Sequence, residues 1–195
     1  MDKIKVFHDF VDKMDRDIFI DYLESNKELF TVSVPDDYGD YPPRLILRFG
    51  KDPMWPDNEL TLEKIYPIKD TFIKYINKSL EKVKENFNDD NVYFNNTWYS
   101  KAEKGAKTGL HSDIEIEANE DLRYSAIMYF NDFDGGELYF PNIEYTIKPK
   151  AGDIIMFPSA GLNYWHDIKP IMSDRYTMPM WFTSSKDKDI FNFIK

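Results

Sequence analysis

Two histidines, one aspartate and one arginine are the residues of this sequence whose types and spacing could do chemistry. The chain has three histidines, at positions 8, 111 and 166, and we expect His8 to be a solvated surface residue. Asp113 follows His111 by two positions, and Arg175 follows His166 by nine. Imidazoles and carboxylates are common metal ligands, and a guanidinium binds a carboxylate through two parallel hydrogen bonds. The segment from His111 to Trp181 therefore contains the groups of a metal centre with an anion-binding residue.

The spacing of these residues indicates which metal they would bind. If residues 110–116 form a strand, the side chains of His111 and Asp113 point to the same face, and His166 supplies a third ligand from elsewhere. Two histidines and one carboxylate form the facial triad that holds Fe(II) and leaves coordination positions open. Zn(II) could use the same ligands, but structural zinc sites usually have four protein ligands, and this chain has no cysteine. We therefore favour an open, catalytic iron site.

The elements that must position these residues fall into two parts. Before residue 90 the apolar spacing predicts helices at 15–30 and 68–87, with short strands at 31–34 and 44–49. After residue 90 the pattern changes to short strands separated by turn residues, expected at 92–100, 110–116, 122–130, 137–140, 145–148, 153–157, 164–168 and 175–182. Helices first and strands afterwards predict an α+β fold, in which a double-stranded β-helix (jelly roll) is braced by N-terminal helices.

Length and charge narrow the class of protein. The 195 residues most simply form one domain, with the jelly-roll core at about 90–183. A net charge of −10 opposes sequence-independent binding to nucleic-acid phosphates. There is no signal-peptide pattern, no cysteine and no run of the ~20 apolar residues that a membrane helix needs. We therefore expect a cytoplasmic protein that binds neither nucleic acid nor membrane.

A series of motifs resembles the Fe(II)/2-oxoglutarate-dependent dioxygenases, and within them the prolyl 4-hydroxylase-like branch. The resemblance covers roughly residues 90–183, and it is specific because the motifs occur together and in order. They are His111-Ser112-Asp113, Ile127-Met128-Tyr129-Phe130-Asn131, Gly135-Gly136-Glu137-Leu138-Tyr139-Phe140-Pro141, Pro149-Lys150-Ala151-Gly152-Asp153 with the following Ile154–Pro158, His166, Asp174-Arg175-Tyr176-Thr177, and Trp181.

The resemblance implies roles for the residues that match. His111, Asp113 and His166 would bind Fe(II), and Arg175 would bind the distal carboxylate of 2-oxoglutarate. Tyr129 matches a tyrosine whose phenol contacts the same carboxylate. These five residues form the predicted catalytic and co-substrate site.

Four further residues are candidates for binding. Thr177 would lie on the same strand face as Arg175 and add a hydroxyl donor. Tyr99 resembles an upstream tyrosine that contacts the co-substrate or substrate, although the segment between it and His111 is longer here than in the family. Trp181 and Arg123 resemble residues on the substrate side of the iron.

The resemblance implies a hydroxylase that uses Fe(II), 2-oxoglutarate and O2, with ascorbate as the reductant that relatives commonly need. The leading interpretation is hydroxylation of a prolyl residue in a peptide or protein. Loops at 35–60 and 100–110 are long enough to hold an extended peptide, the first of them through Tyr38, Tyr41 and Trp55.

Three alternatives were weighed against this interpretation. A hydroxylase of a free amino acid or other small molecule would need a closed lid in place of a groove, which the sequence does not distinguish. A non-catalytic jelly-roll binding module predicts the loss of a ligand or of Arg175, and none is lost. Nucleic-acid demethylases carry a second arginine where this chain has Trp181. The hydroxylated carbon and the oligomeric state stay open.

Overall fold

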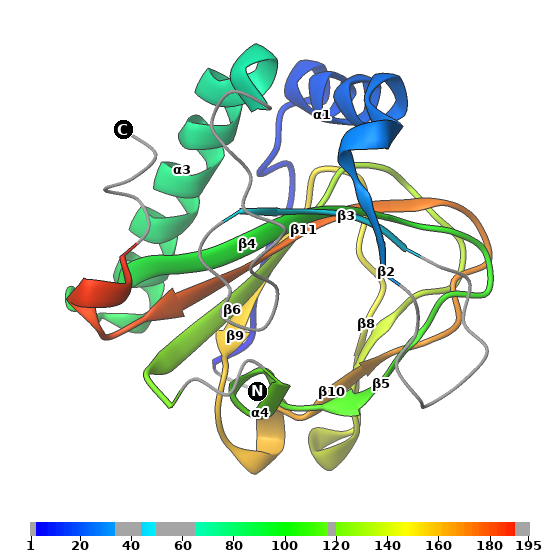
Figure 1. Ribbon diagram of the computed structural model, residues 1–195. Helices are drawn as coiled ribbons and strands as arrows, with labels where there is room; N and C mark the ends of the chain where they lie inside the picture. Colours follow the sequence, from blue (N-terminus) through cyan, green and yellow to red (C-terminus); the bar gives the residue numbers. More distant parts are fainter. Residues whose placement is uncertain (1–2, 34–43, 50–64, 117–119, 190–195) are drawn as a thin grey trace.

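Two β-sheets face each other, and two long helices cover the outer face of the larger sheet (Figure 1). This computed structural model describes residues 3–33, 44–49, 65–116 and 120–189. The arrangement is the α+β jelly roll with bracing helices that the sequence predicts. No helix within the described residues is both long enough and apolar enough to cross a membrane.

The helices and strands follow the expected order. The helices are α1 (Lys13–Ser25), α3 (Lys69–Phe87) and the short α4 (Asp113–Ile116). The larger sheet has the order β1-β9-β6-β11-β4-β3-β2, formed by Lys5–Phe7, Ile154–Pro158, Leu122–Tyr129, Arg175–Thr183, Tyr93–Ala102, Arg44–Phe49 and Thr31–Ser33. The smaller sheet has the order β5-β10-β7-β8, formed by Thr108–His111, His166–Ile168, Leu138–Phe140 and Tyr145–Ile147.

Two local predictions are wrong, and one strand was missed. The first helix ends at Ser25 and not at residue 30, because Asn26 leaves the helical conformation and its side-chain amide donates to the Tyr22 carbonyl. Strand β1 was not predicted, since it has three residues and its partner β9 lies about 150 residues away in the chain. The strand expected at 110–116 ends at His111, and Asp113 begins α4.

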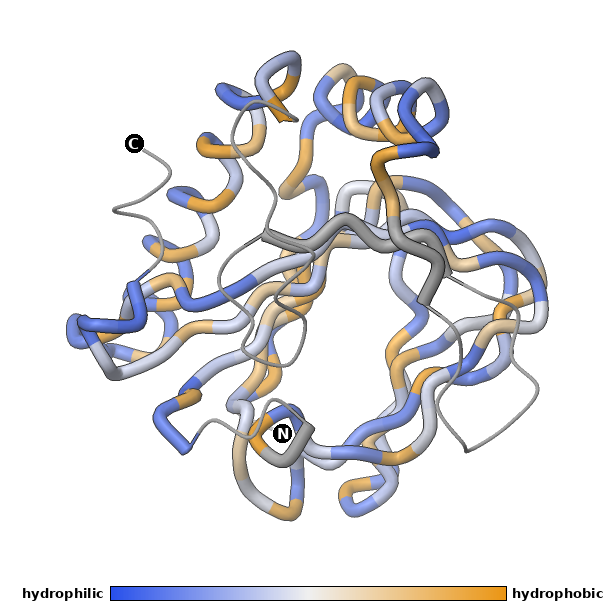
Figure 2. The backbone as a smooth tube through the Cα atoms, in the orientation of Figure 1, coloured by the Kyte–Doolittle hydropathy of each residue, from blue (hydrophilic) through white to orange (hydrophobic). Residues whose placement is uncertain are grey.

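Strand β11 of the larger sheet is buried on both faces. On β11, the residues Tyr176, Met178, Met180 and Phe182 belong to the hydrophobic cluster beneath α1 and α3. The alternate residues, which include Arg175, therefore face the smaller sheet. Apolar residues recur along both helices (Figure 2), and α3 buries Phe72, Tyr75, Ile76, Ser79 and Val83. One strand thus contributes side chains to two different interiors.

Three loops are joined by hydrogen bonds at the end of the barrel where β11 begins. The Gly105 amide donates to the Ile171 carbonyl at 2.7 Å, and the Gly136 amide donates to the Pro170 carbonyl at 3.1 Å. Gly135 has a φ of +68°, and a Cβ there would lie 2.3 Å from the Pro170 carbonyl oxygen. Glycine is therefore required at this position, and this end of the barrel is closed.

Glu24 joins the C-terminal end of α1 to the larger sheet. Its carboxylate accepts hydrogen bonds from Lys101 at 3.0 Å and from the Tyr176 hydroxyl at 2.6 Å. Lys101 is buried and also pairs with Asp174 at 2.9 Å. Burial raises the pKa of Glu24, but hydrogen bonds from Lys27, Tyr176 and Lys101 lower it further, to about 2. The charged carboxylate therefore stabilises the fold.

We expect Glu24→Gln to lower the free energy of unfolding at pH 7 by about 1 kcal/mol, a modest value because water screens a side chain that is one third exposed. Because the folded pKa of about 2 lies below the ordinary 4.5, this stabilisation is complete above about pH 5 and is lost as the pH falls toward 2. Urea unfolding between pH 7 and pH 3 measures both effects. Asp17→Asn, which removes an exposed partner of Lys13, is the control. Equal stability of Glu24→Gln and wild type at pH 7 would contradict the prediction.

Candidate active site

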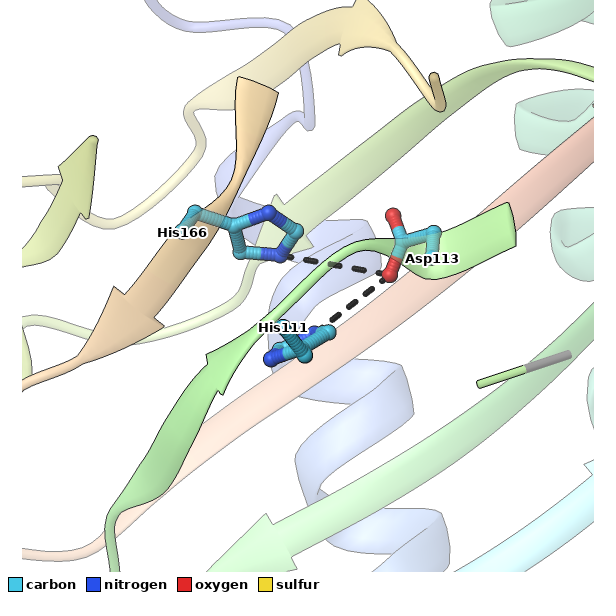
Figure 3. Close-up of side chains that lie close together, drawn as sticks. All are labelled: His111, Asp113 and His166. Carbon is cyan, nitrogen blue, oxygen red and sulfur yellow. Dashed lines mark ion pairs between the residues drawn. The ribbon is translucent and has the colours of Figure 1, made fainter. Parts of the chain in front are cut away.

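His111 and His166 lie opposite each other on paired strands of the smaller sheet. They are register partners in β5 and β10, and their ring centroids are 4.3 Å apart. Figure 3 shows both imidazoles directed toward the carboxylate of Asp113. The distances to Asp113 Oδ1 are 3.5 Å from His111 Nε2 and 3.9 Å from His166 Nε2. The structure therefore brings together the three residues that the sequence singles out.

The other nitrogen of each ring fixes the imidazole in place. Nδ1 of His111 donates to the Gly109 carbonyl at 2.8 Å, and Nδ1 of His166 donates to the Tyr164 carbonyl at 2.9 Å. A carbonyl can only accept, so each Nδ1 carries the proton and each Nε2 presents its lone pair. This backbone support of the second ring nitrogen is typical of metal-binding histidines.

Asp113 reaches the histidines from the first position of α4, and not through strand alternation as predicted. Burial raises the pKa of its carboxyl, but the imidazoles of His111 and His166, which attract the carboxylate when they are protonated, lower it further, and a hydrogen bond from Ser125 adds to this effect. For His166, burial lowers the pKa of the imidazole more than the Asp113 charge raises it. An anionic carboxylate and a neutral imidazole are the forms that bind metals.

The chemistry of this donor set fits a divalent metal ion. One ligand atom from each of the three residues lies within 4.8 Å of the other two, and no fourth histidine or acidic residue joins the group within the described part of the chain. Three ligands on one side leave positions for exchangeable ligands, as in the facial triad. His166 is further enclosed by the rings of Phe157 and Phe140, with centroids at 4.9 and 5.6 Å.

Arg175 is buried at the closed end of the same interior and is 3% exposed. Its Nε and Nη1 atoms have no hydrogen-bond partner among the described residues. Burial removes the guanidinium from water and thereby lowers its pKa. A desolvated charge requires a counter-charge, so this end of the interior is suited to an anionic ligand.

Tyr129 and Thr177 lie beside Arg175. They are register partners on β6 and β11, so their side chains share the face that carries Arg175. The Tyr129 hydroxyl is buried without a hydrogen-bond partner among the described residues. Burial raises the pKa of this hydroxyl more than the charge of Arg175 lowers it. Ser100, which the sequence did not suggest, places its hydroxyl 3.2 Å from that of Thr177. The anion-binding region thus combines one guanidinium with several hydroxyl groups.

Asn131 fixes the backbone on both sides of Arg175. Its side-chain oxygen accepts from the Tyr176 amide at 2.9 Å, and its side-chain nitrogen donates to the Asp174 carbonyl at 2.8 Å. Asn131 ends the Ile127–Asn131 motif, so the motif positions Arg175 as well as Tyr129. Asn131 was part of a motif in the sequence analysis, but no role was predicted for it.

Tyr99 does not reach the site, which corrects the prediction for this residue. Side chains alternate along β4, and Tyr99 points to the helix side of the larger sheet. Its ring packs against Phe19, Phe30 and Phe130 at 5.7, 6.1 and 5.3 Å. The neighbouring Ser100 occupies the inward position that was predicted for Tyr99.

The two predicted substrate residues have different environments. Trp181 is 4% exposed and pairs in register with Ser125, the neighbour of Asp113, on the inner face of the larger sheet. Its ring lies 4.4 Å from that of Trp98, and its indole nitrogen is buried without a hydrogen-bond partner among the described residues. Arg123 is exposed near the start of β6. The predicted peptide-holding residues Tyr38, Tyr41 and Trp55 lie outside the described residues.

His8 is exposed, as expected, but it is not merely solvated. Its Nδ1 lies 2.9 Å from a carboxylate oxygen of Asp153, whose side chain is 3% exposed. The other oxygen of Asp153 accepts from the Lys150 amide at 2.9 Å. His8 therefore attaches the N-terminal segment to the turn before β9, a contact that sequence spacing could not reveal.

Residues 93–183 match the sequence profile of the 2OG-Fe(II) oxygenase superfamily. Prolyl 3-hydroxylase 2 of Mus musculus is 37% identical over 93 aligned residues, and that of Homo sapiens is 36% identical. In both comparisons the match spans 38% of this chain and only 13% of the relative.

Solved structures of similar fold include a prolyl hydroxylase of Trichoplax adhaerens in complex with a hypoxia inducible factor peptide fragment. Its TM-score is 0.65 with 16% identity, covering 96% of this chain and 86% of that one. A prolyl-4-hydroxylase of Pseudomonas putida has a TM-score of 0.63 with 16% identity, covering 93% and 92%. At this identity the likeness shows the fold.

The fold, the three converging ligands and the profile match place residues 93–183 among the 2OG-Fe(II) oxygenases. The chain is similar in sequence to prolyl 3-hydroxylases over 38% of its length, and its fold is similar to that of prolyl hydroxylases of known structure. The predicted resemblance is confirmed. The sequence relatives are prolyl 3-hydroxylases, so the chain is similar to these in addition to the prolyl 4-hydroxylases named in the sequence analysis.

We expect the protein to bind one divalent ion per chain and Asp113→Asn to bind it at least about tenfold more weakly, because one of three ligands loses its charge. Calorimetric titration with Mn(II) measures the affinity. Asp167→Asn is the matched control, since this carboxylate neighbours His166 but pairs with Lys169 at 3.2 Å. Equal affinity in Asp113→Asn and wild type would exclude the site.

Proposed function

We propose that this protein is an Fe(II)- and 2-oxoglutarate-dependent dioxygenase that hydroxylates a prolyl residue of a peptide or protein. The observation that carries the proposal is the occurrence, in one interior, of an open His-Asp-His cluster and a buried Arg175 whose Nε and Nη1 have no hydrogen-bond partner among the described residues. A metal site alone fits many reactions. An additional site for a carboxylate at the closed end fits a co-substrate that bridges the two.

Each residue has a role in this proposal. His111, Asp113 and His166 hold Fe(II), and Arg175 forms a bidentate ion pair with the distal carboxylate of 2-oxoglutarate. Tyr129 donates its phenol proton to the same carboxylate, which satisfies a hydroxyl otherwise buried without a partner. Thr177 and Ser100 supply further hydroxyl contacts along the inner face of the sheet.

Bound Fe(II), with 2-oxoglutarate and O2, supplies the oxidising chemistry that inserts one oxygen atom into a C–H bond and releases succinate and CO2. The chain's own contribution is to orient both substrates and exclude water. The rings of Phe140 and Phe157 enclose His166 on the side of the hydrophobic cluster. This enclosure keeps competing reactions away from the metal. Ascorbate, as in relatives, would restore iron that has become oxidised.

The substrate is placed at the end of the interior away from Arg175. There the rings of Trp98 and Trp181 lie together, and the Trp181 indole N–H has no hydrogen-bond partner among the described residues. Aromatic faces pack well against an apolar ring, and an indole N–H can donate to a peptide carbonyl. A prolyl residue within a peptide offers both features, and a free hydrophilic amino acid does not. Arg123, exposed on β6, would contact acidic groups of the same peptide.

We further propose that residues 1–195 act as one domain, with the jelly roll at about 90–183 as its catalytic core. The expected cytoplasmic location, the lack of nucleic-acid binding and the role of the loops at 35–60 stay predictions. None of these predictions affects the roles proposed for the metal ligands, the co-substrate residues and the substrate residues.

The test of function is succinate formation from 2-oxoglutarate with Fe(II) and ascorbate, with and without proline-containing peptides. We expect succinate to rise with a peptide, to vanish in His111→Ala, and to require about a hundredfold more 2-oxoglutarate in Arg175→Met, because the ion pair is lost. Mass spectrometry of the peptide should show one added oxygen atom, and chromatography against 3- and 4-hydroxyproline standards identifies the carbon.

The other outcomes point elsewhere. Succinate formation that no peptide stimulates would favour hydroxylation of a free amino acid or other small molecule. Absence of succinate from protein with bound iron would favour a binding module without catalysis.

The substrate end is tested with Trp98→Ala. We expect the peptide KM to rise about tenfold, because an aromatic contact is lost, while the KM for 2-oxoglutarate stays at the wild-type value. Tyr66→Ala, which removes a tyrosine that is 76% exposed in the short 3-10 turn before α3, is the control. A peptide KM that does not change in Trp98→Ala would remove Trp98 from the proposed substrate site.

A further inference from the structure

Phe133, in the loop between β6 and β7, packs against both groups assigned to the distal carboxylate. Its ring stacks on that of Tyr129, with centroids 5.8 Å apart and planes inclined by 19°. The guanidinium carbon of Arg175 lies 5.8 Å from the centroid of the same ring. Phe133 is 6% exposed and belongs to the hydrophobic cluster inside the barrel. It therefore forms a wall of the region that would hold the carboxylate.

Phe133 is also one of the residues that line an open cavity. This cavity has a volume of about 460 Å³ and is lined by Phe133, the flanking Asp132 and Asp134, and residues 148–150. Neither Tyr129 nor Arg175 lines it. Phe133 thus contacts both groups of the buried site and also lines an open space large enough for several more atoms.

Contacts on both sides prevent the ring from withdrawing. Gly136 has a φ of +64°, and a Cβ built there would lie 3.1 Å from the Phe133 ring, so the backbone itself lies directly behind it. Before the ring, Asp132 accepts from the Ala151 amide at 2.9 Å. After it, the Asp134 amide donates to the Ser173 hydroxyl at 2.9 Å. The second glycine of the Gly135-Gly136 pair therefore makes room for this aromatic ring.

We propose that Phe133 is a specificity-determining residue that limits the length of the dicarboxylate bound by Arg175. The inference rests on the proposed function and adds a determinant that the ligand set does not supply. A rigid wall behind Arg175 and Tyr129 fixes the distance between the metal cluster and the carboxylate site. A 2-oxo dicarboxylate with one more methylene could fit only by displacing the ring. A difference of one methylene in a closed pocket is worth about 10- to 200-fold in discrimination.

The experiment compares the binding of 2-oxoglutarate and its longer homologue 2-oxoadipate by calorimetry, with Mn(II) in place of iron so that no turnover is needed. We expect the wild type to prefer 2-oxoglutarate by at least about tenfold. In Phe133→Leu the preference should fall at least about fivefold, because the smaller side chain opens the wall toward the cavity. In Phe133→Ala both acids should bind more weakly, because water reaches Arg175, and the preference should be abolished.

Phe94→Leu is the matched control, because Phe94 is fully buried on the helix side of the larger sheet, away from the proposed site. It should lose stability to a similar extent and keep the wild-type preference. The ratio of the two affinities is the decisive readout, since a merely structural role of Phe133 would weaken both acids equally. An unchanged ratio in Phe133→Leu overturns this inference alone. Failure of the wild type to bind 2-oxoglutarate overturns the proposed function as well.

Discussion

The buried guanidinium of Arg175 imposes the constraint on which the site depends. Taking an ion out of water costs several kcal/mol, and here no described acidic side chain offsets that cost. The fold holds the charge there by fixing its backbone: Asn131 bonds to both flanking residues, and Lys101 pairs with Asp174 on the other face of the sheet. Some of the stability provided by the rest of the core thus offsets the cost of burying this guanidinium in an ordered position.

The alternation of β11 explains how one strand can serve this site and also anchor the helices. Its inward residues, among them Arg175 and Trp181, mark the two ends of the reactive interior, and its outward residues fill the core beneath α1 and α3. The neighbouring strand β4 follows the same rule, so Ser100 faces inward and Tyr99 outward. A change in the packing of the helices therefore acts on the site through the backbone of these two strands.

The sequence allowed prediction of the fold class and of the residues that converge, because the motifs occur in order and the strands are bounded by turn residues. It predicted Asp113 for the wrong reason, since the expected strand ends at His111 and Asp113 reaches the site from the first position of α4. Tyr99 was misplaced because a tyrosine on a strand fits a core as well as a site. Nothing in the sequence pointed to Phe133, because the inference about it depends on its contacts with Tyr129 and Arg175. These residues lie 4 and 42 positions away along the chain, and only the fold brings all three together.

The pairing of β1 with β9 has a consequence for biosynthesis. Lys5 lies opposite Met156, so the first strand has no partner until about 150 further residues have been made. A three-residue strand has no stability of its own, and the pairing closes one edge of the larger sheet. During translation this edge of β9 stays open until β1 returns to it, and an open edge can pair with another chain. The nascent protein is therefore most prone to aggregate after β9 has joined the sheet and before β1 has docked.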